Sequence, residues 1–565
     1  GSIDYLESLN PYAEEFSVPS VPLPPILQKY GRDIKQHFYD IKNYAMFKDM
    51  LMNQNVNECR STYYPHQAWT VYQPDKFKTG LIKDMSKVKD DLNLNVEVGK
   101  GVNLGNDIYV VNTPSEKGMY GFNTKGELVW RINEMYNLSI TVLDNGHLLL
   151  GNTGYIANYS RTGLIEIDYL GKIYNVYDLE GGYHDETVVL PSGNYLVLSS
   201  NITRSTVSDL IVEINPKNGK IVKTWDFKKI VNDISAKFVE NIDFSDWASI
   251  NSIYYDKKSD TILLSVSGRN SIVSIGYKSS KINWIFGDIK YWNNNFKDYI
   301  VSYDGTYPMV SNSISLNKNG NLVLFNNGMD GSLTEDSLCS NYIGSHSKGQ
   351  IYKIENKKAT LVSEFTDNNG FYSYAVSNYT ELNSGNYLLF SAWEFGEGTM
   401  EAEGCTMNAN VKGLHSLIYE TNKDNSVLFK ASFNGGSNRA AKVDMYDKTN
   451  KNFVVKDINY YNTLDSTIYE ELKNENIVDK VKNAEKSVYS VSLTKNLLTI
   501  NAVFQNDDEV YVLLVGKNNK SYKYLSKSKG NYLQPVVNLR GVSGEYALFL
   551  VINDVYYNLD KTYKF

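Results

Sequence analysis

One histidine of the chain, His184, combines a reactive side chain with a position where a binding site is expected. The chain of 565 residues holds six histidines. An unperturbed imidazole is largely neutral near pH 7, so it can act as a general base or as a nucleophile. His184 lies in the run Tyr183-His184-Asp185, directly before an apolar run that reads as a buried strand. We take it as a candidate catalytic residue, with a structural role as the alternative, whereas His147 adjoins a turn glycine and is expected to be structural.

Motifs for the common cofactor and metal sites are missing from the sequence. There is no GxxxxGK[ST], GxSxG, HExxH or CxxC, and the cluster Gly99, Gly101 and Gly105 does not have GxGxxG spacing. The run Asp367-Asn368-Asn369-Gly370 is more typical of a hairpin or Asx turn than of a calcium loop. We therefore expect neither a metal nor a cofactor.

The composition is that of a globular protein rich in β-structure. Hydrophobic residues make up 42% and charged residues 21%, and no apolar run is long enough for a transmembrane helix. The net charge of -7 disfavours binding to nucleic acid. Tyrosine, with 45 residues, favours half-buried strands and polar-tipped pocket walls. The oligomeric state is not predicted.

A repeated hairpin is the clearest organising pattern. Each copy has an apolar alternating strand, a short turn rich in Asn, Lys and Gly, and a second strand. The six copies span residues 118–131, 164–177, 210–225, 271–284, 350–365 and 417–433. Trp130, Trp225 and Trp284 end three of them at equivalent places.

A second, more apolar hairpin precedes each copy. Its turns are expected at Gly105, Gly146, Gly193, Asp260, Gly320 and Gly385. Six pairs of hairpins predict six four-stranded units, the pattern of a six-bladed β-propeller. A long meander or two stacked sandwiches is the alternative, but neither explains the sixfold alternation.

The flanking segments differ from the repeats. We expect an N-terminal, part-helical extension over residues 1–102, with a proline cluster and a helix over 26–52. The propeller follows over 103–450, then a polar, partly helical linker over 451–486. Six or seven short strands over 487–565 predict a small C-terminal β-sandwich. The class is all-β. Gly1-Ser2 is typical of residual vector sequence, and we expect that a secretion signal preceded it.

Loop lengths distinguish the two faces of the predicted propeller. The longest connections, residues 228–248, 288–311, 328–349 and 393–416, all lie on one face, which we take as the site. Cys339 and Cys405 lie in two of these loops, in neighbouring repeats. We expect them to form a disulfide and Cys59 to be free; three unpaired thiols are the alternative.

The repeats resemble the bacterial arylsulfotransferases that work without phosphoadenosine phosphosulfate. The resemblance covers residues 118 to about 443. It rests on the runs YHDETVVLPSGNYLVLSS, DWASINSIYYDKKSDTILLSVS, SKINWIFGD, SISLNKNGNLVLFNNG and SNRAAKV. It implies a six-bladed propeller that moves a sulfuryl group from an aryl sulfate to a phenol through a histidine intermediate. It also implies a location outside the cytoplasm, extracellular or at the cell surface.

Most catalytic positions of that family are substituted in this chain. The family's HD motif matches at His184, but its next histidine falls on Ser249 and its arginine on Ser267, two positions before Arg269. The nucleophilic histidine falls on Asn312, and an amide forms no stable sulfuryl intermediate. The SNRAAKV run supplies a further arginine, Arg439. We therefore predict a site with His184 and Arg269 as catalytic groups and with Ser249, Ser267, Asn312 and Arg439 as substrate-binding groups.

The predicted function is sulfuryl transfer between phenolic compounds, or a degenerate descendant of that activity. The expected ligand is a small phenolic compound or aryl sulfate. Two other readings stay open: a non-catalytic propeller that binds a ligand or glycan, and a hydrolase or lyase that uses the same pocket. Ser249 and Asn312 also have a plainer reading, in which they satisfy backbone groups at the start of a buried strand.

Overall fold

The computed structural model describes the chain from residue 90 onward, with gaps. The described ranges are 90–112, 118–132, 136–152, 155–157, 160–169, 171–201, 206–232, 246–328, 347–368, 370–373, 376–394, 415–435, 437–445, 459–462, 469–473, 477–487, 491–494, 497–500, 510–517, 520–526, 536–538 and 542–564. The helix expected over 26–52 and the three cysteines lie outside the described residues. The described part is mostly β-strand, and none of its helices is long and apolar enough to span a membrane.

Between residues 95 and 462, the described residues form six sheets, each built on four antiparallel strands. Sheet I has the order β27 (Arg439–Val443), β2 (Ile108–Asn112), β3 (Met119–Phe122), β4 (Leu128–Ile132). Sheet II has β5 (Asn137–Val142), β6 (Leu148–Gly151), β8 (Ser160–Ile167), β9 (Ile173–Tyr183). Sheet III has β10 (Thr187–Val189), β11 (Tyr195–Ser199), β12 (Leu210–Asn215), β13 (Lys220–Asp226).

The other three sheets repeat this order along the chain. Sheet IV has β14 (Ile250–Asp256), β15 (Thr261–Val266), β16 (Ser271–Gly276), β17 (Ile282–Phe286). Sheet V has β19 (Ser311–Leu316), β20 (Leu322–Asn326), β21 (Lys348–Glu355), β22 (Lys358–Phe365). Sheet VI has β23 (Asn378–Glu381), β24 (Tyr387–Glu394), β25 (His415–Thr421), β26 (Val427–Asn434).

Short elements extend or connect these sheets. Extra strands are β1 (Asn95–Val98) on β26, β7 (Tyr155–Ala157) on β8, β18 (Ser302–Tyr303) on β22, and β28 (Asn459–Asn462) on β9. The helical turns are α8 (Phe227–Val231), η2 (Ser267–Arg269), η3 (Ile289–Tyr291) and η4 (Asn294–Tyr299).

The strand pairing confirms the six outer hairpins expected from the sequence, from β3–β4 to β25–β26. The inner hairpin expected at Gly105 is wrong. The strand before that glycine, β1, pairs with β26 instead, and β2 pairs with β27 in the register Ile108↔Val443. Strand β27 comes from the other end of the repeats, so a local sequence pattern cannot reveal this partner. The pairings β1–β26 and β2–β27 thus join the first and last repeats by backbone hydrogen bonds.

Consecutive sheets share hydrophobic clusters. One cluster lies between each neighbouring pair, I–II, II–III, III–IV, IV–V and V–VI, and a further one joins VI to I. Hydrogen bonds join the first strands in the same order. The N–H of Ser139 donates to the carbonyl of Asp185 (2.9 Å) between II and III. Asn378 and Ala440 exchange bonds of 3.0 and 3.1 Å between VI and I.

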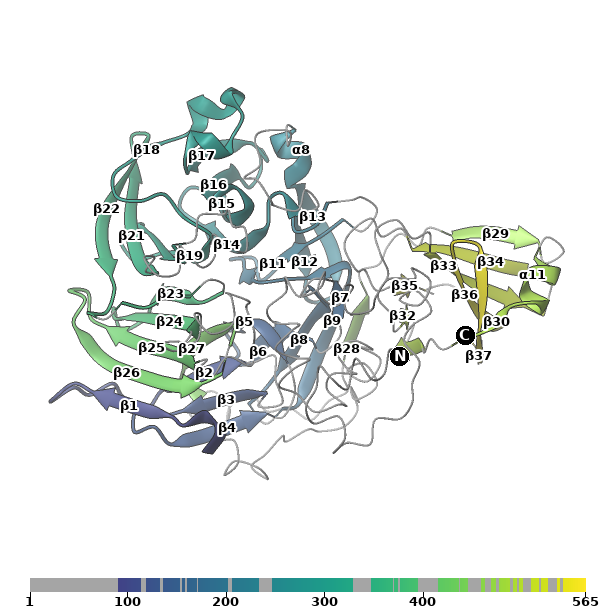
Figure 1. The fold of residues 1–565 in the computed structure, drawn as a ribbon, viewed down its shortest axis with the longest axis horizontal. Helices are drawn as coiled ribbons and strands as arrows, with labels where there is room; N and C mark the ends of the chain where they lie inside the picture. The colour runs from purple at the N-terminus through teal and green to yellow at the C-terminus, as the bar shows by residue number, and fades with distance from the viewer. Residues whose placement is uncertain are drawn as a thin grey trace, which may run out of the picture.

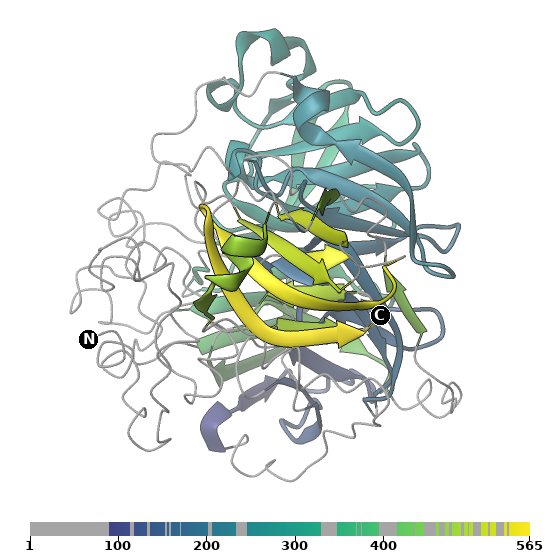
Figure 2. The ribbon, with the colours of Figure 1, turned by 90° about the vertical axis from the view of Figure 1, so that its right-hand side faces the viewer.

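The C-terminal strands form two further sheets, which lie to one side of the six (Figure 1) and face the viewer in Figure 2. The first has the order β29 (Tyr469–Lys473), β34 (Lys520–Ser526), β33 (Val510–Gly516), β36 (Glu545–Ile552), β37 (Val555–Lys564), β30 (Glu485–Lys486). The second has β31 (Val491–Thr494), β32 (Leu497–Ile500), β35 (Val536–Asn538), and α11 (Val478–Lys482) precedes it in the chain. The segment expected as a partly helical linker thus also supplies strands β28, β29 and β30.

Candidate functional site

Polar side chains from four sheets meet near the beginnings of the first strands. They are Glu186, Ser252, Asn312, Asn327 and Arg439, and we call this group the Arg439 cluster. Glu186 directly precedes β10, Ser252 lies on β14, Asn312 on β19 and Arg439 on β27, while Asn327 follows β20. Two of the five, Asn312 and Arg439, are residues predicted from the sequence. Apart from Glu186, all are at most 5% exposed.

The backbone is bent where these strands begin. Non-glycine residues adopt positive φ at Leu138 (70°), Asp185 (56°), Ser249 (42°), Val310 (49°), Ser313 (58°) and Ser377 (80°). Register shifts interrupt the pairing of β5, β14 and β19 at the same places. Such conformations cost roughly 1–3 kcal/mol each and persist only when surrounding structure holds them. The strain therefore sets the direction of the side chains that enter the cluster.

Arg439 is the cation of the cluster, and its hydrogen bonds are long. Its Nη2 donates to Glu186 Oε1 (3.3 Å) and to Asn312 Oδ1 (3.5 Å), and its Nη1 donates to the carbonyl of Asn438 (3.2 Å). Its Nε is buried and has no partner among the described residues. Charge-assisted N–H···O bonds usually measure about 2.7–2.9 Å. The guanidinium therefore has donor capacity left for an anion.

Glu186 is the carboxyl group of the cluster. Its Oε2 accepts from the hydroxyl of Ser252 (2.5 Å) and from the N–H of Ile253 (3.0 Å). Burial raises the pKa of Glu186, and the charge of Arg439 together with these two hydrogen bonds opposes the rise without cancelling it. Its protonation therefore needs a smaller drop in pH than that of an ordinary glutamate.

Asn312 occupies the place where the resemblance puts a nucleophilic histidine. Its Nδ2 donates to Asn327 Oδ1 (2.9 Å), and Asn327 in turn donates to the carbonyl of Ser373 (2.8 Å). Both amides are thus held within the cluster. Asn312 can orient an anion through its amide, but it cannot carry a sulfuryl group.

His184 differs from the neutral imidazole expected from the sequence. The ring is buried, its Nδ1 lies 2.8 Å from Asp185 Oδ2, and its Nε2 lies 3.2 Å from the carbonyl oxygen of Ser199. Burial alone would lower the pKa of His184, but Asp185, the Ser199 carbonyl and the charge of Asp246 raise it above the ordinary value. Both ring nitrogens face acceptors, so the surroundings favour the protonated ring more than in an ordinary histidine and make it a poor nucleophile.

Ser249 and Ser267 bond to each other rather than to the Arg439 cluster. The hydroxyl of Ser267 donates to the carbonyl of Ser249 (2.5 Å), and the Ser267 N–H reaches the same oxygen (3.3 Å). This geometry fits the plainer reading given to Ser249, the satisfaction of backbone groups at a strand end.

Arg269 is buried in an aromatic setting of its own. Its guanidinium carbon lies 5.4 Å from the ring centre of Trp247 and 5.9 Å from that of Trp292, and its Nη1 donates to the carbonyl of Tyr291 (2.9 Å). With 1% of its surface exposed, it links η2 to the loop around η3. These contacts place the guanidinium of Arg269 beside two tryptophans and a backbone carbonyl.

No group of three or more His, Cys, Asp or Glu side chains within the described residues could hold a metal ion. The groups of the Arg439 cluster can bind an anion through a buried cation and amides, and its carboxyl group can exchange a proton.

Comparison with known proteins identifies the family. The family model "Arylsulfotransferase (ASST)" matches residues 93–457, more than half of the chain. The chain belongs to the arylsulfotransferase family. This confirms the resemblance drawn from the sequence, and the matched range includes every residue of the Arg439 cluster.

Two relatives carry the same name. The arylsulfate sulfotransferase AssT of Escherichia coli O6:H1 is 26% identical over 293 residues, which cover 40% of this chain and 48% of that protein. The enzyme of the same name from Lelliottia amnigena is 22% identical over 313 residues, covering 42% and 50%. The chain thus spans about half the length of these arylsulfotransferases.

Solved structures with similar shapes are more distant. A streptogramin B lyase covers 76% of this chain and 97% of its own, at 9% identity and a TM-score of 0.30. The periplasmic gluconolactonase PpgL of Pseudomonas aeruginosa covers 60% and 100%, at 8% identity and a TM-score of 0.35. At such scores these likenesses carry no functional argument.

Three members of the cluster were not predicted from the sequence: Glu186, Ser252 and Asn327. Glu186 follows His184 by two residues within the quoted HDE run, so its carboxylate could have been found from that motif. Ser252 and Asn327 carry no such signal. They join the cluster because neighbouring sheets contact each other.

Proposed function

We propose that the chain binds an aryl sulfate at the Arg439 cluster and is a sulfuryl-transfer protein that lacks the usual covalent histidine. The observation that carries this proposal is Arg439 itself. It is a buried guanidinium with long hydrogen bonds and an Nε that has no partner in the described part of the chain, and the chain belongs to the arylsulfotransferase family. A sulfate ester presents three oxygens that suit a planar guanidinium.

The proposal also includes the detailed domain organisation of the chain. We take residues 103–450 as a six-bladed propeller, with an extension over 1–102, a linker over 451–486 and a β-sandwich over 487–565. Support comes from the six hydrophobic clusters, which run from each sheet to the next and from VI back to I. The Arg439 cluster would then lie where the inner strands converge, the usual place for a binding site in such a ring.

With Asn312 in place of a nucleophile, the remaining route is a direct transfer. The hydroxyl of an acceptor phenol gives its proton to Glu186, its oxygen bonds to sulfur, and the bond from sulfur to the donor's phenolic oxygen breaks. Arg439 and the Asn312 amide hold the sulfuryl oxygens during this exchange. The loss of a covalent carrier commonly removes several orders of magnitude in rate, so we expect weak transfer.

In this proposal His184 is a fixed positive charge rather than a nucleophile. Its ring nitrogens face Asp185 and the Ser199 carbonyl, and the backbone of the same turn carries Glu186, whose N–H donates to the His184 carbonyl (2.8 Å). It would therefore position Glu186 and add favourable potential for an anion. Ser249, Ser267 and Arg269 would support the surrounding structure.

We also propose where the protein acts and which kind of molecule it binds. We expect a location outside the cytoplasm, at the cell surface or secreted, and a small phenolic partner. Formation of the Cys339–Cys405 disulfide stays a prediction that fits an oxidising compartment. Non-reducing peptide mapping of the native protein tests it, and two free thiols at these positions would contradict it.

Calorimetric titration with 4-nitrophenyl sulfate tests the proposed site, with wild type and Arg439→Gln compared. We expect wild type to bind 4-nitrophenyl sulfate and Arg439→Gln to lose this binding. Equal binding by the two proteins would contradict the proposed site. Release of 4-nitrophenol that requires added phenol would indicate transfer, whereas release without phenol would indicate a hydrolase.

A further inference from the structure

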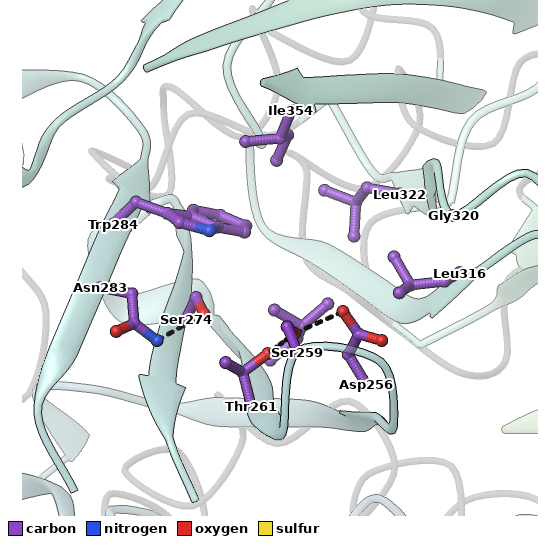
Figure 3. A pocket seen from close by; sticks show the side chains of 11 residues that line it. Asp256, Ser259, Thr261, Ser274, Asn283, Trp284, Leu316, Gly320, Leu322 and Ile354 are labelled. Atoms are coloured by element: carbon purple, nitrogen blue, oxygen red, sulfur yellow. Dashed lines mark hydrogen bonds between the residues drawn. The ribbon is translucent and has the colours of Figure 1, made fainter. Parts of the chain in front are cut away.

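A hollow lies at the other end of two strands that carry residues of the Arg439 cluster. It has a volume of about 370 Å³ and lies between the facing sides of sheets IV and V (Figure 3). Asp256 and Leu316, at the ends of β14 and β19, line it, whereas Ser252 and Asn312 lie four residues earlier on the same strands. Four residues of strand span about 13 Å, so the two sites are separate.

The hollow lies where sheet IV carries a shorter side chain than sheets II, III and VI. Equivalent rows of cross-strand partners run through four sheets. They are Leu149–Glu166–Asn175 in II, Leu196–Glu213–Lys223 in III, Leu388–Glu420–Phe429 in VI, and Leu263–Ser274–Trp284 in IV. Sheet IV therefore has a serine where three other sheets have a glutamate.

In sheets III and VI the glutamate fills the space toward the next sheet. Glu213 accepts the hydroxyl of Tyr277 from sheet IV, and Glu420 accepts the hydroxyl of Tyr109 from sheet I (2.6 Å). Ser274 instead bonds within its own sheet, where its Oγ accepts from Asn283 Nδ2 (3.3 Å). The space that a carboxylate occupies elsewhere is left open here.

Trp284 is correspondingly less covered than its counterpart Trp130. Trp130 is 5% exposed, packs edge-on against Tyr169 and donates its Nε1–H to the Tyr169 carbonyl (2.6 Å). Trp284 is half-buried and lines the hollow. Its indole lines one side of the hollow, with Leu322 and Ile354 of sheet V opposite (Figure 3).

The polar part of the lining is mostly neutral. Asp256 is the one charged lining group, and its oxygens already accept from the hydroxyl of Ser259 (2.5 Å) and the N–H of Lys258 (3.0 Å). Ser259 Oγ also lies 2.7 Å from Thr261 Oγ1. Hydroxyl and amide groups of this kind can both donate and accept hydrogen bonds.

We propose that this pocket binds a single neutral sugar ring. A pyranose has an apolar face that packs on an indole and hydroxyls that suit a lining of hydroxyl, amide and carboxylate groups. The volume lies at the small end of the range for ligand sites, roughly 300–1,000 Å³. A cationic ligand fits less well, because Asp256 is already satisfied and Lys257 and Lys258 stand exposed on the adjoining turn.

The test is saturation-transfer NMR on the full chain with methyl glycosides of glucose, galactose, mannose and N-acetylglucosamine. Trp284→Ala removes the stacking surface, and Ser274→Glu fills the pocket with the side chain that sheets II, III and VI carry. We expect at least one glycoside to bind wild type and to bind both variants at least about tenfold more weakly. Val362→Thr, at an exposed position of β22, is the matched control and should leave binding unchanged.

Ser274→Glu keeps the proposal testable if Trp284→Ala fails to fold, because the glutamate is native to three equivalent rows. No signal from any of the four glycosides with wild type would overturn the proposal. So would binding that Ser274→Glu leaves intact, or tetramethylammonium displacing the glycoside. Arg439→Gln should leave glycoside binding unchanged, so failure of the aryl sulfate site and failure of this pocket are distinguishable.

Discussion

Arg439 Nη2 lies 3.3 Å from Glu186 Oε1, and this buried ion pair joins sheet I to sheet III. The two side chains are 253 residues apart in sequence and are 6% and 13% exposed. A buried pair is costly unless both partners are well bonded, yet the Nε of this arginine has no partner among the described residues. That arrangement suits a site whose ligand completes the bonding of the cation.

Arg439→Gln should abolish most binding of aryl sulfates. Hydrogen bonds to a charged group contribute about 1.5–3 kcal/mol, so the dissociation constant should rise roughly 10- to 100-fold. Titration calorimetry with 4-nitrophenyl sulfate measures this dissociation constant.

Arg439→Gln should also be less stable than wild type, because Glu186 loses its partner. The double change with Glu186→Gln should recover part of that loss of stability. A double variant that is less stable than Arg439→Gln would contradict this coupling.

Binding of aryl sulfates should weaken as pH rises. Burial raises the pKa of Glu186. Below that pKa the carboxyl is neutral and leaves Arg439 to the ligand; above it the carboxylate competes for Arg439 and repels the anion. Glu186→Gln should therefore bind more tightly than wild type at high pH and show no such pH dependence. Glu186→Gln should also lose residual sulfuryl transfer, because glutamine cannot accept the proton of the acceptor phenol. Equal pH slopes in the two proteins would argue against this role.

His184 should stabilise the fold most at low pH. Its pKa in the folded protein is raised, so its contribution is complete below the ordinary value of about 6.5 and is lost as pH rises through the folded value. His184→Gln should thus lower the melting temperature more at about pH 6 than at about pH 9. Thermal unfolding of both proteins at the two pH values measures it. A destabilisation that grows with pH would show that the ring is neutral in the fold.

Arg269→Ala should destabilise the protein without changing the affinity of the folded form for aryl sulfates. The side chain lies between Trp247 and Trp292, and its loss removes cation–π contacts and the bond to the Tyr291 carbonyl, together about 2–4 kcal/mol. Chemical unfolding followed by titration at low temperature separates the two effects. Arg269→Lys is the control, and it should recover only part of the stability, since lysine lacks the planar fork.

The hairpin repeats could be predicted from the sequence because a hairpin is local. Alternating apolar residues around Asn, Lys and Gly turns specify β12–β13 or β16–β17 with no help from the rest of the chain. The pairing of β2 with β27 could not be predicted, because its partners lie more than 300 residues apart and the nearer strand β1 has an equally suitable pattern.

The residues of the candidate site also fall into those that local sequence predicts and those that depend on contacts between sheets. Arg439 and Asn312 were found through motifs, whereas Ser252 contributes only because sheet IV contacts its neighbours. Arg269 shows the opposite case, an arginine near the expected position that a 3₁₀ turn directs into a pair of tryptophans. Motif spacing gives the position of a residue along a strand, but the bends at Ser249 and Ser313 decide what its side chain meets.

The most direct test of the account is turnover of 4-nitrophenyl sulfate in the presence of phenol, by wild type, Arg439→Gln and Asn312→His. We predict weak or absent transfer by wild type, further loss in Arg439→Gln, and a gain in Asn312→His with a sulfohistidine detectable by mass spectrometry. Robust wild-type turnover that survives Arg439→Gln would contradict the account, because it would place the sulfuryl chemistry outside the Arg439 cluster.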